Sequence, residues 1–269
     1  MSLNVVLFDD KMKTMGGQNT GKIKNVLKGW IRGTVATQPW LQSQGVYRQL
    51  ARKYLQNSWI ERVGHGAYRL AGDSIDWPGG LHALQNQLAL KIHAGAKTAL
   101  ELEGYAHTVP LGKGQRVWLF GAATTTLPRW FKAYSWSVQV RFVPTNLFAG
   151  DPGVGLTDTQ PEGHSFWIRL SAPERAILET LSLVPAESDF EEAQSLMEGL
   201  DTLRPSLVQT LLEACRSIKA KRLFMHLAEK MNHPWVSHVD VARVNFGKGN
   251  RTIVPGGKFD SKYRITVPA

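Results

Sequence analysis

The pattern of apolar and polar residues is most regular between positions 37 and 70. It predicts a short helix over residues 37–44, which ends at Gly45 because glycine adopts the left-handed conformation at little steric cost. A second helix is predicted over Val46–Asn57, where apolar residues recur at helical spacing. Its buried stripe consists of Leu50, Ala51, Tyr54 and Leu55.

A hairpin is predicted directly after the second helix. Residues 59–63 and 67–70 have the composition of short strands, and the glycines of Gly64-His65-Gly66 permit a tight turn between them. Upstream, the apolar residues of Lys22–Ile31 share one face, which predicts a first helix. This order of elements predicts a winged helix-turn-helix domain over residues 21–73.

The outer face of the second helix carries no acidic residue. This face consists of Tyr47, Arg48, Gln49, Arg52, Lys53 and Gln56. A helix fits the major groove of duplex DNA, where Arg, Lys and Gln reach base edges and phosphates. We therefore expect base contacts from Arg48, Gln49 and Arg52, and phosphate contacts from Lys53, Arg62, Arg69, Lys22 and Lys28. The alternative is an ordinary solvated helix followed by an unrelated hairpin.

The rest of the chain predicts a larger mixed domain. Residues 74–80 are rich in Gly, Asp and Pro and are expected to be a linker to a domain over residues 81–269. Helices are predicted over Leu81–Ile92, Ala96–Glu103, Phe190–Leu200, Ser206–Ser217 and Ala220–Met231, and one more after a capping box of Ser171 and Glu174. Strands are predicted over Gln115–Phe120, which a turn at Gly121 follows, and over Ser137–Phe142, Ser165–Leu170, Val239–Val244, Arg251–Val254 and Tyr263–Val267.

The predicted fold class is therefore α+β: an N-terminal winged helix-turn-helix followed by a larger mixed α/β domain. Residues 1–20 form a poorly specified N-terminal arm to which we assign no function.

Positive charge is concentrated near the two ends of the chain. The formal net charge is +10, which favours anionic partners. Between Gly21 and Asp73, nine Lys or Arg accompany two acids, and from Val241 onward six accompany Asp260 alone. Residues 172–201 are acidic in contrast. Because the positive charge is concentrated in two segments, it is unlike a surface charge that serves solubility alone.

Composition also narrows the setting. No long apolar run and no signal sequence are apparent, so we expect no membrane span and a location in the cytoplasm. The single cysteine, Cys215, excludes an internal disulfide and fits a reducing compartment.

The residue patterns of common catalytic and metal centres are missing. The histidines are not spaced as the ligands of one metal ion, and no nucleophile elbow of a hydrolase occurs. The stretch around His93–Thr98 resembles a phosphate-binding loop but lacks the glycines that such a loop requires. We therefore expect no enzyme activity, no cofactor and no metal. Gly247–Arg251 is a candidate anion-binding turn, because glycine-rich turns expose amides beside its cations. A polar hairpin loop explains the same residues equally well.

Several stretches together resemble the AbiEi antitoxins of type IV toxin–antitoxin, or abortive infection, systems. They are Ser58–Arg69, Leu84–Leu88, Lys97–His107, Ser171–Glu179 and Gly256–Pro268. Their joint order, from about Lys22 to the C-terminus, is more specific than any one of them.

The resemblance implies a bifunctional regulator that is not an enzyme. Its winged domain would repress its own operon by binding inverted repeats in double-stranded DNA, as a monomer or weak dimer that binds cooperatively. Its second domain would be an antitoxin domain that counteracts a nucleotidyltransferase-like toxin without a stable complex. The family's DNA-facing positions fall here on Arg48, Gln49, Arg52, Lys53, Gln56 and the turn at His65. Cations expected to extend the DNA contact or to carry antitoxin activity are Lys248, Arg251, Lys258, Lys262 and Arg264.

Two alternatives stay open on the residues alone. One is a winged-helix transcription factor with a ligand-sensing second domain. The other is an enzyme, either a nuclease or a toxin-modifying protein, that carries a DNA-binding domain.

Overall fold

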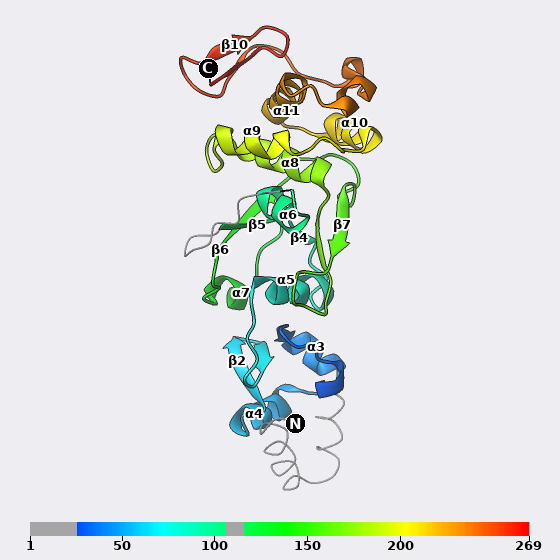
Figure 1. The fold of residues 1–269 in the computed structure, drawn as a ribbon. Coiled ribbons are helices and arrows are strands. Elements are labelled where there is room, and N and C mark those ends of the chain that lie inside the picture. The colour runs from blue at the N-terminus through cyan, green and yellow to red at the C-terminus, as the bar shows by residue number, and fades with distance from the viewer. Residues whose placement is uncertain (1–25, 106–115, 269) are drawn as a thin grey trace. The chain divides into compact units, whose positions relative to one another are not determined.

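A computed structural model describes residues 26–105 and 116–268, which divide into two compact units (Figure 1). The first unit contains residues 26–90 together with Leu127–Ser135 and Glu162–Phe166, and the second contains the remaining described residues. The first unit thus continues past the linker expected at residues 74–80, and it includes two segments from later in the chain. The predicted arm over residues 1–20 lies outside the described residues.

The first unit has the predicted winged helix-turn-helix arrangement. Residues 26–29 are helical, and the elements that follow are β1 (Ala36–Thr37), α3 (Gln38–Ser43), α4 (Arg48–Gln56), β2 (Ile60–Gly64), β3 (Ala67–Leu70) and α5 (Trp77–Asn86). The three strands form an antiparallel sheet in the order β1-β3-β2. Strand β1 was not predicted, because two residues are too few to show an alternating pattern.

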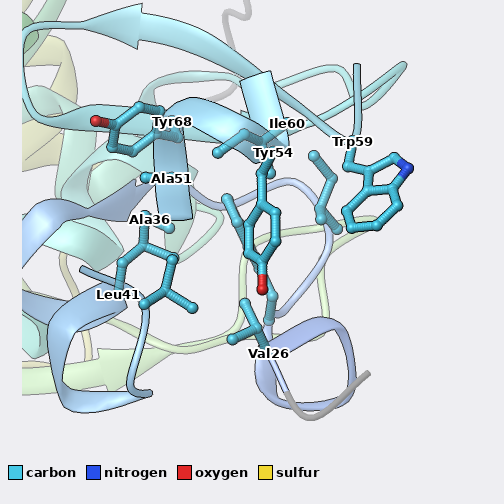
Figure 2. Close-up of a cluster of buried hydrophobic side chains, with 11 residues drawn as sticks. Val26, Ala36, Leu41, Ala51, Tyr54, Trp59, Ile60 and Tyr68 are labelled. Atoms are coloured by element: carbon cyan, nitrogen blue, oxygen red, sulfur yellow. The ribbon is translucent and has the colours of Figure 1, made fainter. Parts of the chain in front are cut away.

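A continuous apolar core holds these elements together (Figure 2). Its members come from every part of the motif: Val26, Ala36, Leu41, Ala51, Tyr54, Trp59, Ile60 and Tyr68. Each fully buried aliphatic or aromatic side chain contributes about 1.5–3 kcal/mol relative to an exposed one. The core therefore explains why the short helices, which are marginal in isolation, are stable here.

The expected linker is partly helical, and the predicted helix over Leu81–Ile92 is displaced. Asp76 caps α5 by accepting a hydrogen bond from the amide of Gly79 at 3.3 Å, so residues 77–80 form its first turn. A Cβ on Gly79 would lie 1.9 Å from the carbonyl oxygen of Gly33, which explains the glycine at this close backbone approach. The helix ends at Asn86, and Ile92 begins a strand instead.

The second unit is built on a mixed five-stranded sheet with the order β6-β5-β4-β8-β7. Its strands are β4 (Ile92–Ala94), β5 (Arg116–Ala122), β6 (Gln139–Thr145), β7 (Leu156–Thr159) and β8 (Ile168–Ser171). Gly121, predicted as a turn, lies inside β5, where a Cβ would approach the Phe142 ring to 3.1 Å. Strands β4 and β7 are short and were not predicted.

Helices and a small sheet complete the second unit. The helices are α6 (Ala96–Leu102), α8 (Pro173–Leu183), α9 (Phe190–Glu198), α10 (Pro205–Ala214) and α11 (Ile218–Lys230). The small sheet has the order β10-β11-β9 and consists of β9 (Arg251–Thr252), β10 (Lys258–Asp260) and β11 (Ile265–Val267). The α+β class is therefore confirmed.

Two local predictions in this unit are wrong. The residue before α8 is Ala172, without a side-chain cap, while Ser171 donates to Glu179 and Glu174 accepts from Arg204, so no capping box forms. The strand predicted over Val239–Val244 does not form: a short 3-10 helix, η2 (Val241–Arg243), lies there instead, preceded by a second one, η1 (Pro234–His238). Asp240 caps η2 by accepting from the amide of Ala242 at 3.1 Å.

Candidate nucleic-acid interface

The outer face of α4 is fully presented to solvent. Its polar residues, with Tyr47 before them, are all exposed: Arg48, Gln49, Arg52, Lys53 and Gln56. Within the described parts of the chain, none of the three cations on this face has an acidic ion-pair partner. Unpaired cations on a solvent-facing helix attract a polyanion without first breaking an internal ion pair.

The opposite face anchors α4. Ala51 and Tyr54 are completely buried, and the Tyr54 and Trp59 rings lie 5.4 Å apart (Figure 2). Gly45, at a φ of 78°, makes the turn that lets the amide of Val46 donate to the carbonyl of Leu41 at 2.8 Å. The orientation of the cationic face is therefore fixed by the core and by this turn.

The two wing strands supply further cations, which differ in their availability. Arg62 and His65 are exposed. Arg69 is half-buried and donates from Nε to Glu61 at 2.8 Å, with Nη2 at 2.6 Å from the same carboxylate. This hydrogen bond from Arg69, together with one from the amide of Gly72, lowers the pKa of Glu61. The charge of Arg69 is thus already compensated, which makes it a weaker candidate for a phosphate contact than the exposed Arg62.

One helix of the first unit was missed by sequence reasoning. Helix α7 (Arg129–Ala133) packs against β2, and a Cβ on Gly64 would lie 2.7 Å from the Cβ of Trp130. The helix carries two exposed cations, Arg129 and Lys132. The signal for it is an apolar pair, Trp130-Phe131, between two cations, but nothing local relates that pair to a wing far upstream.

Of the two lysines expected to contact phosphate from the first helix, the structure describes one. Lys28 is exposed and lies in the helical segment 26–29. Lys22 lies outside the described residues.

The C-terminal cations do not form one uniform group. Lys248, Arg251, Lys258 and Arg264 are exposed and have no acidic ion-pair partner within the described chain. Lys262 is also exposed, but its Nζ lies 2.7 Å from both carboxylate oxygens of Glu229.

The candidate anion-binding turn over residues 247–251 contacts a buried arginine through its backbone. Arg222 donates to the carbonyl of Phe246, just before the turn, at 2.9 Å and to the carbonyl of Gly249 at 2.7 Å. The amide of Gly247 donates to Asn245 Oδ1 at 2.8 Å and is therefore occupied.

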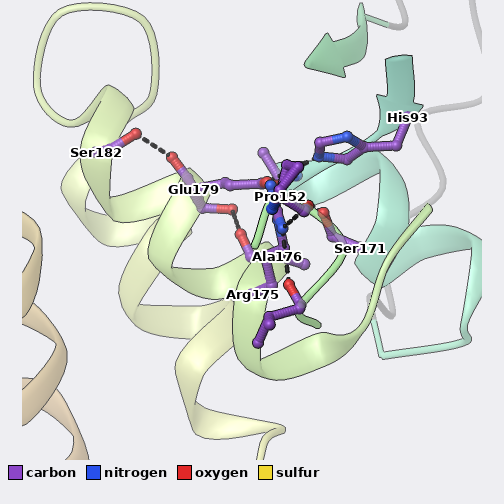
Figure 3. Close-up of polar contacts among 10 residues, drawn as sticks. His93, Pro152, Ser171, Arg175, Ala176, Glu179 and Ser182 are labelled. Atoms are coloured by element: carbon purple, nitrogen blue, oxygen red, sulfur yellow. Dashed lines mark hydrogen bonds and ion pairs between the residues drawn. The ribbon is translucent and has the colours of Figure 1, made fainter. Parts of the chain in front are cut away.

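The densest polar cluster of the second unit is closed to solvent (Figure 3). Glu179 lies with Oε1 2.9 Å from both His93 Nε2 and Arg175 Nε, and its Oε2 accepts from Ser171 at 2.8 Å and from the amide of Ala96 at 3.0 Å. Burial raises the pKa of Glu179, but the charges and hydrogen bonds of His93 and Arg175 outweigh burial and lower the pKa to about 2. The cluster ties β4, α6, β8 and α8 together.

Across residues 26–105 and 116–268, no group of three His, Cys, Asp or Glu side chains is arranged to hold a metal ion. Among the helices of the same residues, none has the length and apolarity that a bilayer crossing requires.

Comparison with known proteins identifies two family matches along the chain. Residues 19–111 match the N-terminal domain of the transcriptional regulator, AbiEi antitoxin, and residues 114–268 match the transcriptional regulator, AbiEi antitoxin, of the type IV toxin–antitoxin system. No curated protein matches. The crystal structure of the RV2827C protein from Mycobacterium tuberculosis is similar in fold, with a TM-score of 0.56 and 14% identity over 91% of this chain and 90% of that one.

Proposed function

Because the chain belongs to the AbiEi antitoxin family of type IV toxin–antitoxin systems, we propose that it represses its own operon by binding double-stranded DNA through α4. The observation that carries this proposal is the exposed, acid-free cationic face of that helix. Arg48, Gln49 and Arg52 contact bases in the major groove, because bidentate Arg and Gln pairs discriminate between bases. Lys53 and Arg62 contact phosphates and set the register of the helix on the duplex.

The expected target is a pair of inverted repeats in its own promoter, in the cytoplasm. One copy of the protein occupies each repeat, so the protein is a monomer or weak dimer in solution and binds cooperatively on DNA. Gln56 and His65 lie at the edges of this interface, Lys28 adds a contact to phosphate, and Lys22 is expected to add another.

The test of this proposal is an electrophoretic mobility shift with the protein's own promoter fragment. Arg48→Ala/Arg52→Ala is expected to lose at least tenfold in affinity, since each good bidentate base contact contributes about 1–3 kcal/mol. In Lys53→Ala/Arg62→Ala, the slope of log K against log salt should become shallower by about 0.9 for each phosphate contact that is lost.

A control of equal charge loss separates the interface from general electrostatics. Arg141→Ala/Arg169→Ala removes two exposed arginines that are paired with Glu187 at 3.3 Å and Asp158 at 3.0 Å. It should bind the promoter nearly as well as the wild type. Equal losses for this control and for the double arginine variant of α4 would mean that α4 is not the reading helix.

We also propose that the protein counteracts a nucleotidyltransferase-like toxin encoded beside it, and that it does so as a regulator rather than as an enzyme. Support comes from the family and from the match of residues 114–268, which include most of the second unit, to the antitoxin model. The test is growth rescue on co-expression with the neighbouring toxin gene. Rescue by Arg48→Ala/Arg52→Ala, together with no co-purification of toxin, is expected if neutralisation needs neither operator binding nor a stable complex. Loss of rescue in that folded variant would contradict the proposed separation.

A further inference from the structure

Three arginines converge at the small C-terminal sheet. Arg251 and Arg264 lie on adjacent segments, since the amide of Arg251 donates to the carbonyl of Arg264 at 3.0 Å. Asn250 orients both side chains: its backbone oxygen accepts from Arg251 Nη1 at 3.1 Å, and its Oδ1 accepts from Arg264 Nε at 3.2 Å. Both guanidinium groups are therefore fixed around one residue, with their remaining N–H groups exposed.

The third arginine lies beneath this pair. Arg222 is 1% exposed, and its Nη1 donates to the carbonyls of Gly249 at 2.7 Å and Arg264 at 2.9 Å. Its charge is therefore held close to the other two by neutral oxygens, and no carboxylate of the described residues is paired with it. Burial lowers the pKa of Arg222, and the nearby charges of Arg251 and Arg264 lower it further.

Two other exposed cations of the same unit have acidic partners. Lys262 is paired with Glu229 at 2.7 Å and Arg243 with Glu213 at 2.8 Å. By contrast, Arg251 and Arg264 have no acidic ion-pair partner in the described chain. The same holds for Lys248, which lies in the turn whose carbonyls accept from Arg222. Mutual repulsion of clustered like charges opposes folding unless an anion compensates it.

The backbone gives a second and independent indication. Arg264 has a φ of 51°, in the left-handed region where side chains with a Cβ are disfavoured. Strained non-glycine residues of this kind concentrate at ligand-binding sites. Glycine would adopt this conformation without that strain.

We propose that Arg251 and Arg264 form a phosphate-binding site on the C-terminal sheet, supported from below by the charge of Arg222. Guanidinium groups match phosphate oxygens in a bidentate geometry, which favours phosphate over a single carboxylate. The phosphate comes from a nucleic-acid backbone or from a free polyphosphate. This site is separate from the DNA contact of α4 and does not depend on it.

The experiment uses the full-length protein and two probes, sodium tripolyphosphate and a short duplex without the operator. Titration calorimetry is performed with Arg251→Gln/Arg264→Gln and with a matched control, Lys262→Gln/Arg243→Gln, which removes the same charge from two acid-paired positions. Both are made in an Arg48→Ala/Arg52→Ala background, so that failure of the α4 proposal does not affect the result. We expect the first variant to bind at least one probe tenfold or more weakly than the control.

The pattern of losses identifies the source of the phosphate. Weaker binding of both probes would indicate that the site takes any accessible phosphate. Weaker binding of the duplex alone would indicate that the site takes the phosphates of a nucleic-acid backbone. Equal binding of both probes by the variant and the control would overturn the site. The unfolding midpoint of Arg251→Gln/Arg264→Gln without ligand should not fall below that of the control at low salt, because repulsion is relieved. A lower midpoint would show that the arginines are structural and would also overturn the proposal.

Discussion

Two buried tyrosines of the first unit differ in how their hydroxyl groups are used. Tyr68 donates to Gln38 Oε1 at 3.2 Å, whereas the Tyr54 hydroxyl has no partner among the described residues, and burial raises the pKa of Tyr54 to about 12. Tyr54→Phe is expected to leave the free energy of unfolding unchanged or to raise it slightly, since it removes an unsatisfied buried polar group. Tyr68→Phe should cost about 0.5–1.5 kcal/mol, the net value of a lost hydrogen bond.

Chemical denaturation of both single variants measures this difference. Because each replacement keeps the ring, the two variants differ only in the lost hydroxyl. A larger loss in Tyr54→Phe than in Tyr68→Phe would show that the Tyr54 hydroxyl is hydrogen-bonded in solution.

The buried carboxylate of Glu179 makes the stability of the second unit dependent on pH. Its pKa is lowered from 4.5 to about 2, so the folded state binds a proton less readily than the unfolded chain. The stabilisation is therefore complete above about pH 4.5 and is lost as pH falls toward 2. Glu179→Gln should unfold more easily at neutral pH by about 3–5 kcal/mol, because it leaves Arg175 buried without its charged partner.

The same variant should also show a flatter stability profile in acid. Urea denaturation between pH 2 and pH 6, followed by circular dichroism, measures both effects. Ser182→Ala serves as a control on the same helix, because its hydroxyl donates only to the backbone carbonyl of Glu179 at 2.7 Å (Figure 3). An unchanged acid profile in Glu179→Gln would mean that other carboxylates dominate the transition.

At the scale of elements, the contact between the wing and α7 is the least expected feature. Gly64 has no room for a side chain: an added Cβ would lie 2.7 Å from Trp130 Cβ and 3.0 Å from its Cα. Gly64→Ala is expected to destabilise the first unit by about 1–3 kcal/mol, because overpacking forces the wing and α7 apart. Gly29→Ala is the matched control, since nothing lies within 4 Å of its added Cβ. Thermal unfolding of the two variants separates the effects, and equal midpoints would show that the wing moves freely away from α7.

The elements that could be predicted from the sequence are those fixed by local patterns. Helices α3 and α4, the hairpin and the helices of the second unit follow from apolar spacing and from Gly45. The exposed cations of α4 follow from the same stripe, since the opposite face must be solvated. Strands β1 and β4 were missed because they are two and three residues long and depend on partners distant in the chain.

Two other misses arise from long-range contacts. Ser171 fits a capping motif, but its hydroxyl donates a hydrogen bond to the buried Glu179 instead of capping the helix. Tertiary structure therefore overrides the local signal. Likewise, nothing near Lys262 in the sequence indicates that Glu229 neutralises it. The availability of a cation is therefore a tertiary property, whereas its presence on a helix face is a local one.

At the scale of the whole molecule, the first unit is not a contiguous stretch of the chain. It needs Leu127–Ser135, which carries α7, and Glu162–Phe166, whose His164 Nε2 lies 3.0 Å from Asp76 Oδ2. A fragment that ends at residue 90 lacks both segments and exposes the surface that Trp130 and Phe166 cover. It is therefore expected to lose about 3 kcal/mol or more of stability, roughly the cost of deleting one large buried aromatic side chain.

Cutting the chain after residue 90 should therefore weaken DNA binding and abolish antitoxin activity. The fragment is expected to unfold at a lower temperature than the winged unit of the intact protein and to bind the promoter more weakly, although α4 is unchanged. Adding a stabilising osmolyte should recover part of the binding, because folding rather than contact is limiting. Antitoxin rescue should be absent in all conditions, since the whole second unit is missing. A fragment that binds the promoter as tightly as the full chain, with the same unfolding midpoint, would show that the later segments are dispensable for the DNA-binding unit.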